Sequence, residues 1–204
     1  RTHPPRTLKM LATAGIPVVE LMDSVSPCYD SAVGLDNRLA SFEMTQAMIA
    51  RGCRRVIYLG ARHDERTFMR LQGYEQAMRD AGLEPGNVMT QESSSYSLGA
   101  RQLHQVRADY PDADGLFCTN DDLAIGAIFE CQRLGIRIPQ DLAVAGFHGH
   151  DVGRVMTPKL ASVLTPRDLM GRRAAEVLLA RLRGELPPQQ IVDVGFELLP
   201  GESI

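Results

Sequence analysis

Short apolar runs alternate with longer stretches of helical periodicity along the whole chain, and this alternation restricts the possible folds more than any other feature. The clearest run is LAVAGF at 142–147, in which no polar residue interrupts the apolar ones. A strand that is apolar on both sides must be covered on both faces, as in parallel sheets flanked by helices. The pattern therefore predicts an α/β fold assembled from βαβ units.

Glycines and capping residues set the expected boundaries, with Gly52, Gly82 and Gly135 each following the last residue of a helical pattern. We expect strands at 16–22, 33–35, 56–59, 87–91, 115–118, 142–147, 160–164 and 191–199. We expect one helix that ends at residue 14 and another between a cap at 36–37 and Gly52. Four further helices are expected at 65–80, 98–110, 121–134 and 169–182.

Three loops that follow predicted strands are unusually polar: 60–67, which leads into Arg70, then 119–122 and 148–151. In open α/β sheets, ligands bind outside the carboxyl ends of the strands. Loops of this kind at one sheet edge predict a polar cleft for a polyhydroxylated or anionic small molecule. Two simpler readings stay open: Asn120 and Asp121 as helix caps only, and the serines at 93–95 as an ordinary polar loop.

Composition and missing motifs exclude several classes of function. A net charge of −3, the absence of tryptophan and 5% aromatic residues argue against nucleic-acid binding by this chain alone. No G-x-S-x-G, P-loop, G-x-G-x-x-G or H-E-x-x-H motif is present, and His148-Gly149-His150-Asp151 lacks a second ligand cluster. We therefore expect no catalysis, no metal and no cofactor.

The cellular setting is expected to be cytoplasmic. No apolar run approaches the roughly 20 residues of a membrane span, and no signal peptide opens the chain. The four cysteines, at 28, 53, 118 and 131, form no C-x-x-C pair and are expected to be reduced thiols.

Two strings carry a family resemblance, TNDDLAIGA at 119–127 and IPQDLAVAGF at 138–147. With their neighbours they resemble the LacI/GalR family of bacterial transcription regulators over essentially the whole chain. LGARHDERT, SSSYS and GFHGHD are most similar to the gluconate-utilisation repressors of that family.

The resemblance implies two doubly wound parallel-sheet subdomains of the periplasmic-binding-protein-like type, with ligand between them. The first is expected to be incomplete, comprising 1–60 joined by the helix at 165–184. The second is expected to comprise 61–164 joined by the strand at 190–204. The chain begins with Arg1, not Met, and the resemblance implies that a helix-turn-helix headpiece and the first part of the core precede it.

The resemblance also assigns effector contacts to Arg70 and Asn120, and a third to a position that is usually Asp but here is His148. A carboxylate there would repel an acid, whereas His can donate a hydrogen bond and become cationic, which favours a sugar acid as the ligand. Arg66 and Arg167 are further candidate lining residues, since Arg binds carboxylates through two hydrogen bonds. Ser94 falls where relatives often place an aromatic residue, which favours hydroxyl contacts.

We expect the effector-binding and dimerisation domain of a repressor that senses gluconate or a related sugar acid and changes its operator DNA affinity. 6-Phosphogluconate, 2-ketogluconate and idonate are open alternatives. The expected partners are that acid, operator DNA through the headpiece, and a second copy in a homodimer or tetramer, with no membrane. The alternatives are a free periplasmic-type sugar-binding protein and a small α/β enzyme.

Overall fold

The computed structural model describes residues 3–24 and 28–204, which form two compact units. Unit 1 contains the described residues up to Asp36 together with Pro166–Phe196. Unit 2 contains Asn37–Thr165 together with Glu197–Ile204. The chain therefore crosses between the units after Asp36, after Thr165 and after Phe196.

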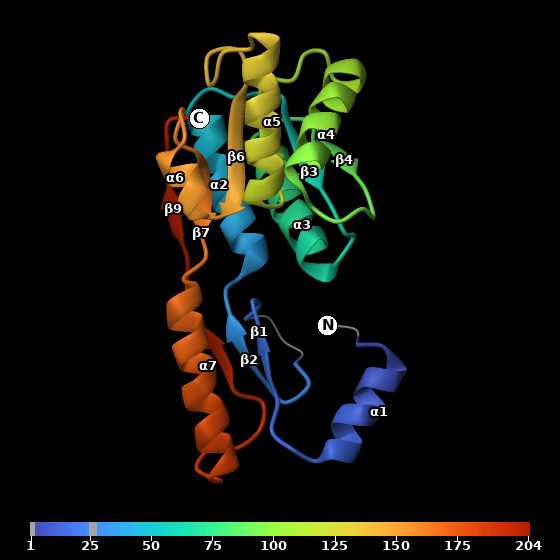
Figure 1. Cartoon of the computed structure of the whole chain (residues 1–204), viewed down its shortest axis with the longest axis vertical. Coiled ribbons are helices and arrows are strands. Elements are labelled where there is room, and N and C mark those ends of the chain that lie inside the picture. The colour runs from blue at the N-terminus through green and yellow to red at the C-terminus, as the bar shows by residue number, and fades with distance from the viewer. Residues whose placement is uncertain (1–2, 25–27) are drawn as a thin grey trace. The chain divides into compact units, whose positions relative to one another are not determined.

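Unit 2 is built on a six-stranded sheet with the order β4-β3-β5-β6-β7-β9 (Figure 1). Its strands are β3 (Val56–Gly60), β4 (Gly86–Met89), β5 (Gly115–Cys118), β6 (Ala143–His148), β7 (Ala161–Leu164) and β9 (Glu197–Leu199). All neighbouring strands are parallel except β9, which runs antiparallel to β7 at the edge. The chain proceeds outward from β3 to β4 and then returns to β5, so the strand order reverses between β3 and β5.

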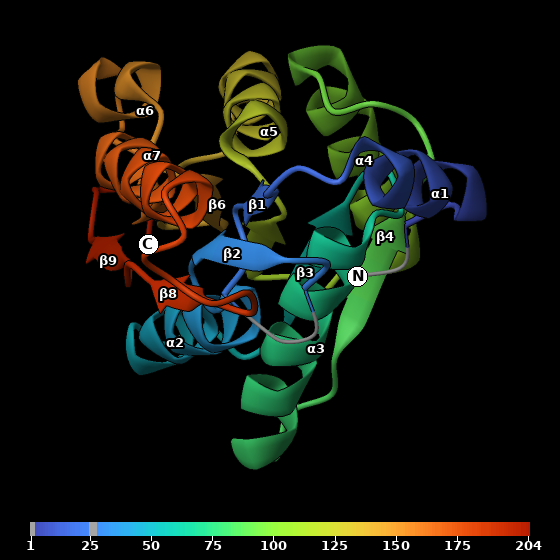
Figure 2. The same ribbon diagram turned by 90° about the horizontal axis from the view of Figure 1, so that it is seen from below.

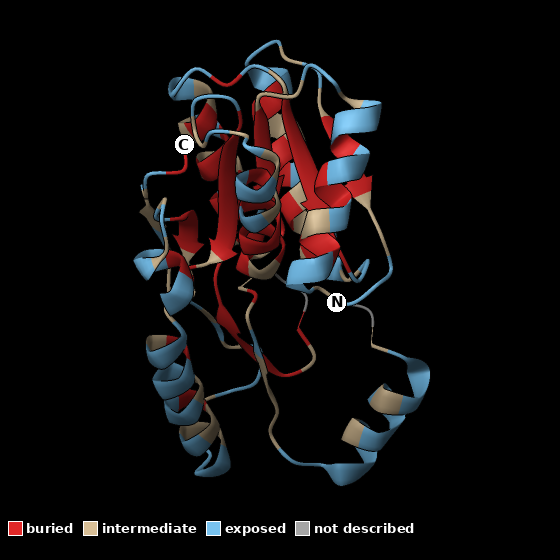
Figure 3. Ribbon diagram, turned by 45° about the horizontal axis from the view of Figure 1, so that its top comes forward, coloured by how far each residue is buried: buried red, intermediate tan, exposed pale blue. Residues whose placement is uncertain are grey.

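Helices cover both faces of this sheet, with α2 and α3 on one side and α4 and α5 on the other (Figure 2). The helices of unit 2 are α2 (Asn37–Ala50), α3 (Glu65–Asp80), α4 (Tyr96–Asp109), α5 (Asp121–Leu134) and the short α6 (Asp151–Val155). Strand side chains alternate between two buried cores: Ile57 and Leu59 join an aliphatic cluster with α4 and α5, whereas Tyr58 stacks on Tyr74 of α3. The inner strands β3, β5, β6 and β7 are accordingly buried almost throughout, whereas the edge strands β4 and β9 are partly exposed. The helices expose their outer faces (Figure 3).

The boundary between the units lies at Asp36, not at residue 60 as we expected from the sequence. The reason is strand pairing: β3 forms parallel ladders with β4 and β5 in the middle of the large sheet. α2 packs against α3 of the same unit. Both elements therefore belong to unit 2.

Unit 1 contains a three-stranded parallel sheet with the order β1-β2-β8. Its elements are α1 (Pro5–Ala14), β1 (Val19–Leu21), β2 (Ser31–Gly34), α7 (Arg167–Leu182) and β8 (Ile191–Asp193). α7 packs on β1 and β2, and Arg181 near its end forms a 3.0 Å ion pair with Asp30, just before β2. The predicted α/β class with two parallel-sheet subdomains is thus confirmed.

The strand predicted at 191–199 is two strands in different sheets. β8 pairs with β2 in unit 1, whereas β9 pairs with β7 in unit 2. Between them Gly195 has a φ of +69° and its N–H donates to Asp193 Oδ1 at 2.7 Å, a turn that ends β8. Among the described residues, none of the helices has the length and apolar character needed to cross a membrane.

Candidate functional site

A cavity of about 200 Å³ lies in unit 2 beyond the carboxyl ends of β3, β5 and β6. This is the place where the strand order reverses, at which open α/β sheets bind ligands. The lining residues come from the three polar loops predicted to meet and from the loop before α4. They are Ala61, Arg62, Asp64, Arg66, Thr67, Arg70, Ser94, Thr119, Asn120, Asp122, His148 and His150.

The loop after β3 and the first turn of α3 bring two further guanidinium groups to the cavity, of which Arg62 is exposed and Arg66 is half-buried. Asp64 caps α3 by accepting a hydrogen bond from the Thr67 N–H at 2.9 Å, which fixes where the helix begins. Arg66 lies in the first turn of α3, with Nη2 at 3.7 Å from Asp64 Oδ2. Arg62 has a φ of +69°, and its N–H donates to the Glu92 carbonyl oxygen at 2.9 Å. The bent backbone therefore places Arg62 in the lining as well.

Arg70 is the buried cation of the site, with only 4% of its surface exposed. Its Nε donates to Asn37 Oδ1 at 2.9 Å and its Nη1 to the Thr119 carbonyl oxygen at 2.5 Å. Its Cζ lies 3.7 Å from the centroid of the Phe147 ring, a cation–π contact. Burial lowers the pKa of Arg70 to about 10, so it remains charged at neutral pH.

No carboxylate among the described residues forms an ion pair with Arg70. A buried charge without an ion-pair partner is costly, and the more distant carboxylates of Asp64 and Asp121 offset only part of the hydration that Arg70 loses. An anion entering the cavity would supply further attraction. The arrangement therefore favours an acidic ligand.

Asn120, after β5, caps a helix and also lines the cavity. Its Oδ1 accepts a hydrogen bond from the Leu123 N–H at 3.2 Å and so caps α5. Its Nδ2 donates to Ser94 Oγ at 2.5 Å, and both side chains line the cavity. In the serine stretch the roles divide, since Ser95 caps α4 while Ser94 faces the cavity.

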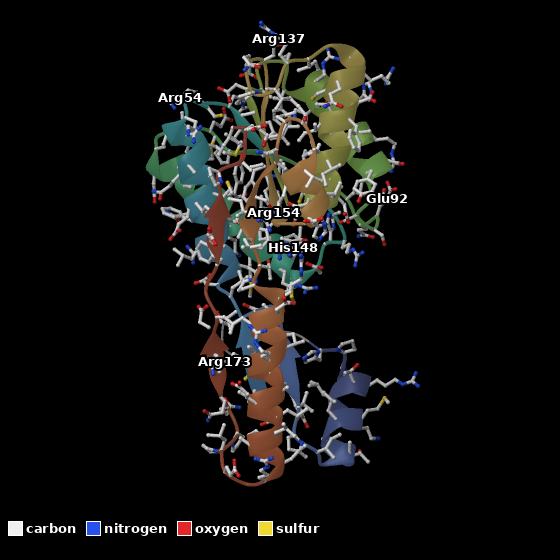
Figure 4. All side chains as sticks on the ribbon, turned by 60° about the vertical axis from the view of Figure 1, so that its left-hand side comes forward. Arg54, Glu92, Arg137, His148, Arg154 and Arg173 are labelled. Atoms are coloured by element: carbon white, nitrogen blue, oxygen red, sulfur yellow. The ribbon has the colours of Figure 1, made fainter. Side chains whose placement is uncertain are left out.

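His148 ends β6 (Figure 4) and has a φ of +109°, which side chains other than glycine rarely adopt. Its Nδ1 lies 3.1 Å from Thr165 Oγ1, and its Nε2 lies 3.4 Å from Arg70 Nη1. A guanidinium can only donate, so Nε2 is the acceptor in this contact. That His148 donates to an acid and becomes cationic stays a prediction; in this structure its Nε2 faces the guanidinium of Arg70.

Asp121, the second capping candidate, holds the loop that carries the histidines. It is fully buried, and it accepts hydrogen bonds at 2.6 Å from Ser162 Oγ through Oδ1 and from the His150 N–H through Oδ2. Ser162 Oγ in turn accepts from the Gly149 N–H at 3.0 Å. Burial raises the pKa of the Asp121 carboxyl, and the Ser162 hydrogen bond opposes that rise. Asp121 therefore supports the site without lining it.

Of the predicted site residues, five line this one cavity: Arg66, Arg70, Ser94, Asn120 and His148. Arg167 does not, because it is the first residue of α7 and belongs to unit 1. The lining residues that we did not single out, such as Arg62, Asp122 and His150, all belong to the predicted polar loops. Within the described ranges, no group of three or more His, Cys, Asp or Glu side chains could hold a metal ion.

Asn37 is a neighbour of the site that sequence reasoning missed. It starts α2 and looks like a capping residue in the sequence, but its side chain is buried and accepts a hydrogen bond from Arg70. The contact arises from the packing of α2 against α3, which no local sequence pattern reveals.

Comparisons with known proteins agree with this geometry. Residues 45–204 match the family model of the periplasmic binding protein-like domain. The HTH-type transcriptional regulator GntR of Escherichia coli K12 is 64% identical over 204 residues, covering 100% of this chain and 62% of the relative. The regulator IdnR of the same organism is 41% identical, covering 99% of this chain and 61% of the relative.

Solved structures of transcription regulators also have the fold of this chain. Transcription regulator GntR from Chromobacterium violaceum has a TM-score of 0.94 and 38% identity, covering 100% of this chain and 75% of that chain. A LacI family transcriptional regulator from Silicibacter pomeroyi has a TM-score of 0.88 and 28% identity, again covering 100% and 75%. This chain spans about three fifths of the length of the curated relatives it matches. It therefore belongs to the periplasmic binding protein-like domain family and, within that family, to the LacI-type transcription regulators.

Proposed function

We propose that this chain is the effector-binding and dimerisation domain of a transcriptional repressor that senses gluconate or a related sugar acid. The observation that carries the proposal is the buried Arg70 guanidinium, which lines a polar cavity and has no carboxylate partner among the described residues. The cavity lining contains three guanidiniums against the two carboxylates of Asp64 and Asp122. Its charge therefore suits an anion.

The ligand's carboxylate is proposed to bind at Arg70, where it would gain charge-assisted hydrogen bonds in a desolvated place. Its hydroxyl groups would bind the amide and hydroxyl groups of Asn120 and Ser94, together with the imidazole of His148. Arg66 is a proposed contact at the more exposed part of the lining. Arg167 is proposed as a contact on the family resemblance alone.

In the whole protein, ligand binding is proposed to change the affinity for operator DNA through a helix-turn-helix headpiece, in a homodimer or tetramer in the cytoplasm. The relatives are named as HTH-type transcriptional regulators, which supports this part of the proposal. The names of the relatives also favour a regulator that binds a ligand without catalysis. They favour it over the two alternatives, an enzyme and a free periplasmic-type sugar-binding protein.

Calorimetry on the full-length protein tests the proposal with gluconate, idonate, 2-ketogluconate and 6-phosphogluconate, and with glucose as the uncharged control. We expect gluconate to bind, glucose to bind at least tenfold more weakly, and gluconate to change operator affinity in a gel-shift titration. Arg70→Lys keeps the charge but loses the planar donor set. It should weaken gluconate binding about 10- to 150-fold, as expected for a lost charged hydrogen bond.

Arg137→Lys is the matched control, because Arg137 is exposed and pairs with Asp141 outside the cavity lining. It should leave gluconate affinity unchanged. Glucose binding as tight as that of gluconate, or an Arg70→Lys variant equal to the control, would contradict an acid site at Arg70.

A further inference from the structure

Two side chains of the cavity are hydrogen-bonded to the residues at which the chain passes between the units. Asn37 is the first residue of unit 2 after the crossing at Asp36, and its Oδ1 accepts from Arg70 Nε at 2.9 Å. Thr165 is the last residue of unit 2 before the crossing at Pro166, and its Oγ1 lies 3.1 Å from His148 Nδ1. Each of the two central cavity residues thus has a partner at a different crossing.

Neither Asn37 nor Thr165 lines the cavity, so each can affect a ligand only through its partner. Both are buried, with 0% and 2% of their surfaces exposed, and water does not compete freely for these hydrogen bonds. The Thr165 N–H also donates to the His148 carbonyl oxygen at 3.4 Å. Backbone and side chain of Thr165 are therefore both tied to His148.

The guanidinium of Arg70 has its orientation fixed from three sides: by Asn37 at Nε, by Thr119 at Nη1 and by the ring of Phe147. A ligand that draws this group toward a carboxylate must strain or move the Nε contact. In the same way, a ligand that turns the His148 ring changes its contact with Thr165. Because hydrogen bonds are directional, a movement of the Arg70 guanidinium or of the His148 ring acts through Asn37 or Thr165 on the backbone at the crossing beside it.

The third crossing provides a comparison within the molecule. It lies between Phe196 and Glu197, and within the described part of the chain neither side chain forms a hydrogen bond with a cavity residue. The link to the cavity is therefore specific to the crossings at Asp36 and Thr165.

We infer that Asn37 and Thr165 are positioning residues through which a ligand held by Arg70 and His148 acts on the two chain crossings that they adjoin. This inference rests on the proposed function, since it needs an effector and a response. Hinges in proteins are commonly a few residues at the ends of elements, which is where both residues lie. Coupling of this kind requires that the ligand favour one arrangement of the crossings over another.

The test compares variants of the full-length protein in two measurements: gluconate affinity by calorimetry, and the ratio of operator dissociation constants with and without saturating gluconate. Thr165→Val keeps the shape and removes the hydroxyl. We expect it to weaken gluconate binding roughly three- to tenfold, as for one lost hydrogen bond. We expect the operator ratio to shrink at least threefold even at saturation, and Thr165→Ser to restore both.

Thr45→Val is the matched control, because Thr45 is equally buried but its hydroxyl donates to Ser41 O within α2. It should leave the operator ratio unchanged. Asn37→Asp is the second variant and should fold, since it retains an acceptor oxygen and a carboxylate is favourable at a helix start. Its charge would hold the guanidinium more firmly, so gluconate binding and the operator ratio should both fall.

The possible failures are distinguishable. A wild-type protein that neither binds gluconate nor responds to it overturns the proposed function and this inference together. The second failure is a wild-type protein that binds gluconate and responds to it, while Thr165→Val and Asn37→Asp have the same operator ratio as Thr45→Val. That result overturns the inference and leaves the proposed function standing.

Discussion

His148 and Arg62 both line the cavity and both hold backbone conformations that side chains other than glycine avoid, with φ values of +109° and +69°. Such residues cost about 1–3 kcal/mol each and persist where the surroundings impose them, often at ligand sites. At His148 the surroundings include Thr165 and the loop held by Asp121. The strain is therefore located where the proposed ligand would bind.

Replacing His148 with glycine and with alanine separates the strain from the side-chain contacts. Both variants lose the imidazole, but only glycine relaxes at positive φ. We expect His148→Gly to be at least about 1 kcal/mol more stable than His148→Ala in urea unfolding without ligand. Both should bind gluconate at least tenfold more weakly than wild type. Equal stability of the two variants would show that the backbone at His148 is not strained.

How far the sequence predicts the site depends on whether a residue follows a strand directly. Arg66, Asn120 and His148 lie in polar loops at the carboxyl ends of predicted strands, so their common sheet edge could be predicted, whereas the ligand contacts of Asn120 and His148 were implied by the family resemblance. Asn37 could not be predicted, because its role depends on a contact with Arg70 that only the packing of α2 on α3 creates. Likewise, the hydrogen bond that makes His148 an acceptor depends on the final position of Arg70.

Helices α4 and α5 approach each other so closely that glycine is required on both. A Cβ at Gly126 would lie 2.0 Å from the Tyr96 carbonyl oxygen, and one at Gly99 would lie 2.1 Å from the Leu123 carbonyl oxygen. The close approach connects the start of α4, beside Ser94, with the α5 that Asn120 caps. The helix pair therefore sets the distance across which Asn120 and Ser94 form their hydrogen bond.

Gly126→Ala should lower the free energy of unfolding by about 1–3 kcal/mol, because the added methyl group forces the two helices apart. Gly171→Ala in α7 is the control, since a Cβ there meets nothing within 4 Å. That variant should gain roughly 0.5–1 kcal/mol from the higher helix propensity of alanine. Chemical denaturation measures both. A Gly126→Ala variant as stable as Gly171→Ala would refute the close packing.

Individual elements were predictable where local chemistry decides their ends. The predicted bounds of the helix at 65–80 and the strand at 115–118 agree with α3 and β5, because Asp64 caps the first and glycine opens the second. The split of 191–199 into β8 and β9 was not predictable. Its sequence is apolar on both sides of Gly195, and only the pairing partners β2 and β7 separate the two strands.

At the scale of the molecule, the parallel sheet of unit 2 has two chemically different ends. The carboxyl ends of β3, β5 and β6 carry the polar loops of the cavity, whereas Pro111 and Ala113 before β5 line a different, partly apolar pocket. The class of fold followed from the sequence, but the division into units did not. It depends on long-range ladders such as Val56 with Gly115, which no local pattern encodes.

Hydrogen exchange on the full-length protein, with and without gluconate, should distinguish these two ends. We expect slower exchange with gluconate at 61–67, 119–122 and 148–150, because the ligand would order those loops. Residues 111–114, at the opposite end of the sheet, are the internal control and should exchange at an unchanged rate. Protection spread equally over both ends would contradict a ligand site at the carboxyl ends of the strands.

The way that unit 2 is completed has a consequence for synthesis on the ribosome. Glu197–Ile204 supplies the antiparallel strand beside β7, and Ser203 Oγ donates to the Val144 carbonyl oxygen at 2.6 Å and accepts from the Ala161 N–H at 2.8 Å. Until these residues emerge, β7 is an unprotected sheet edge, which is prone to pair with other chains. The β7 edge therefore lacks its β9 partner while α7 and β8, which belong to the other unit, are translated.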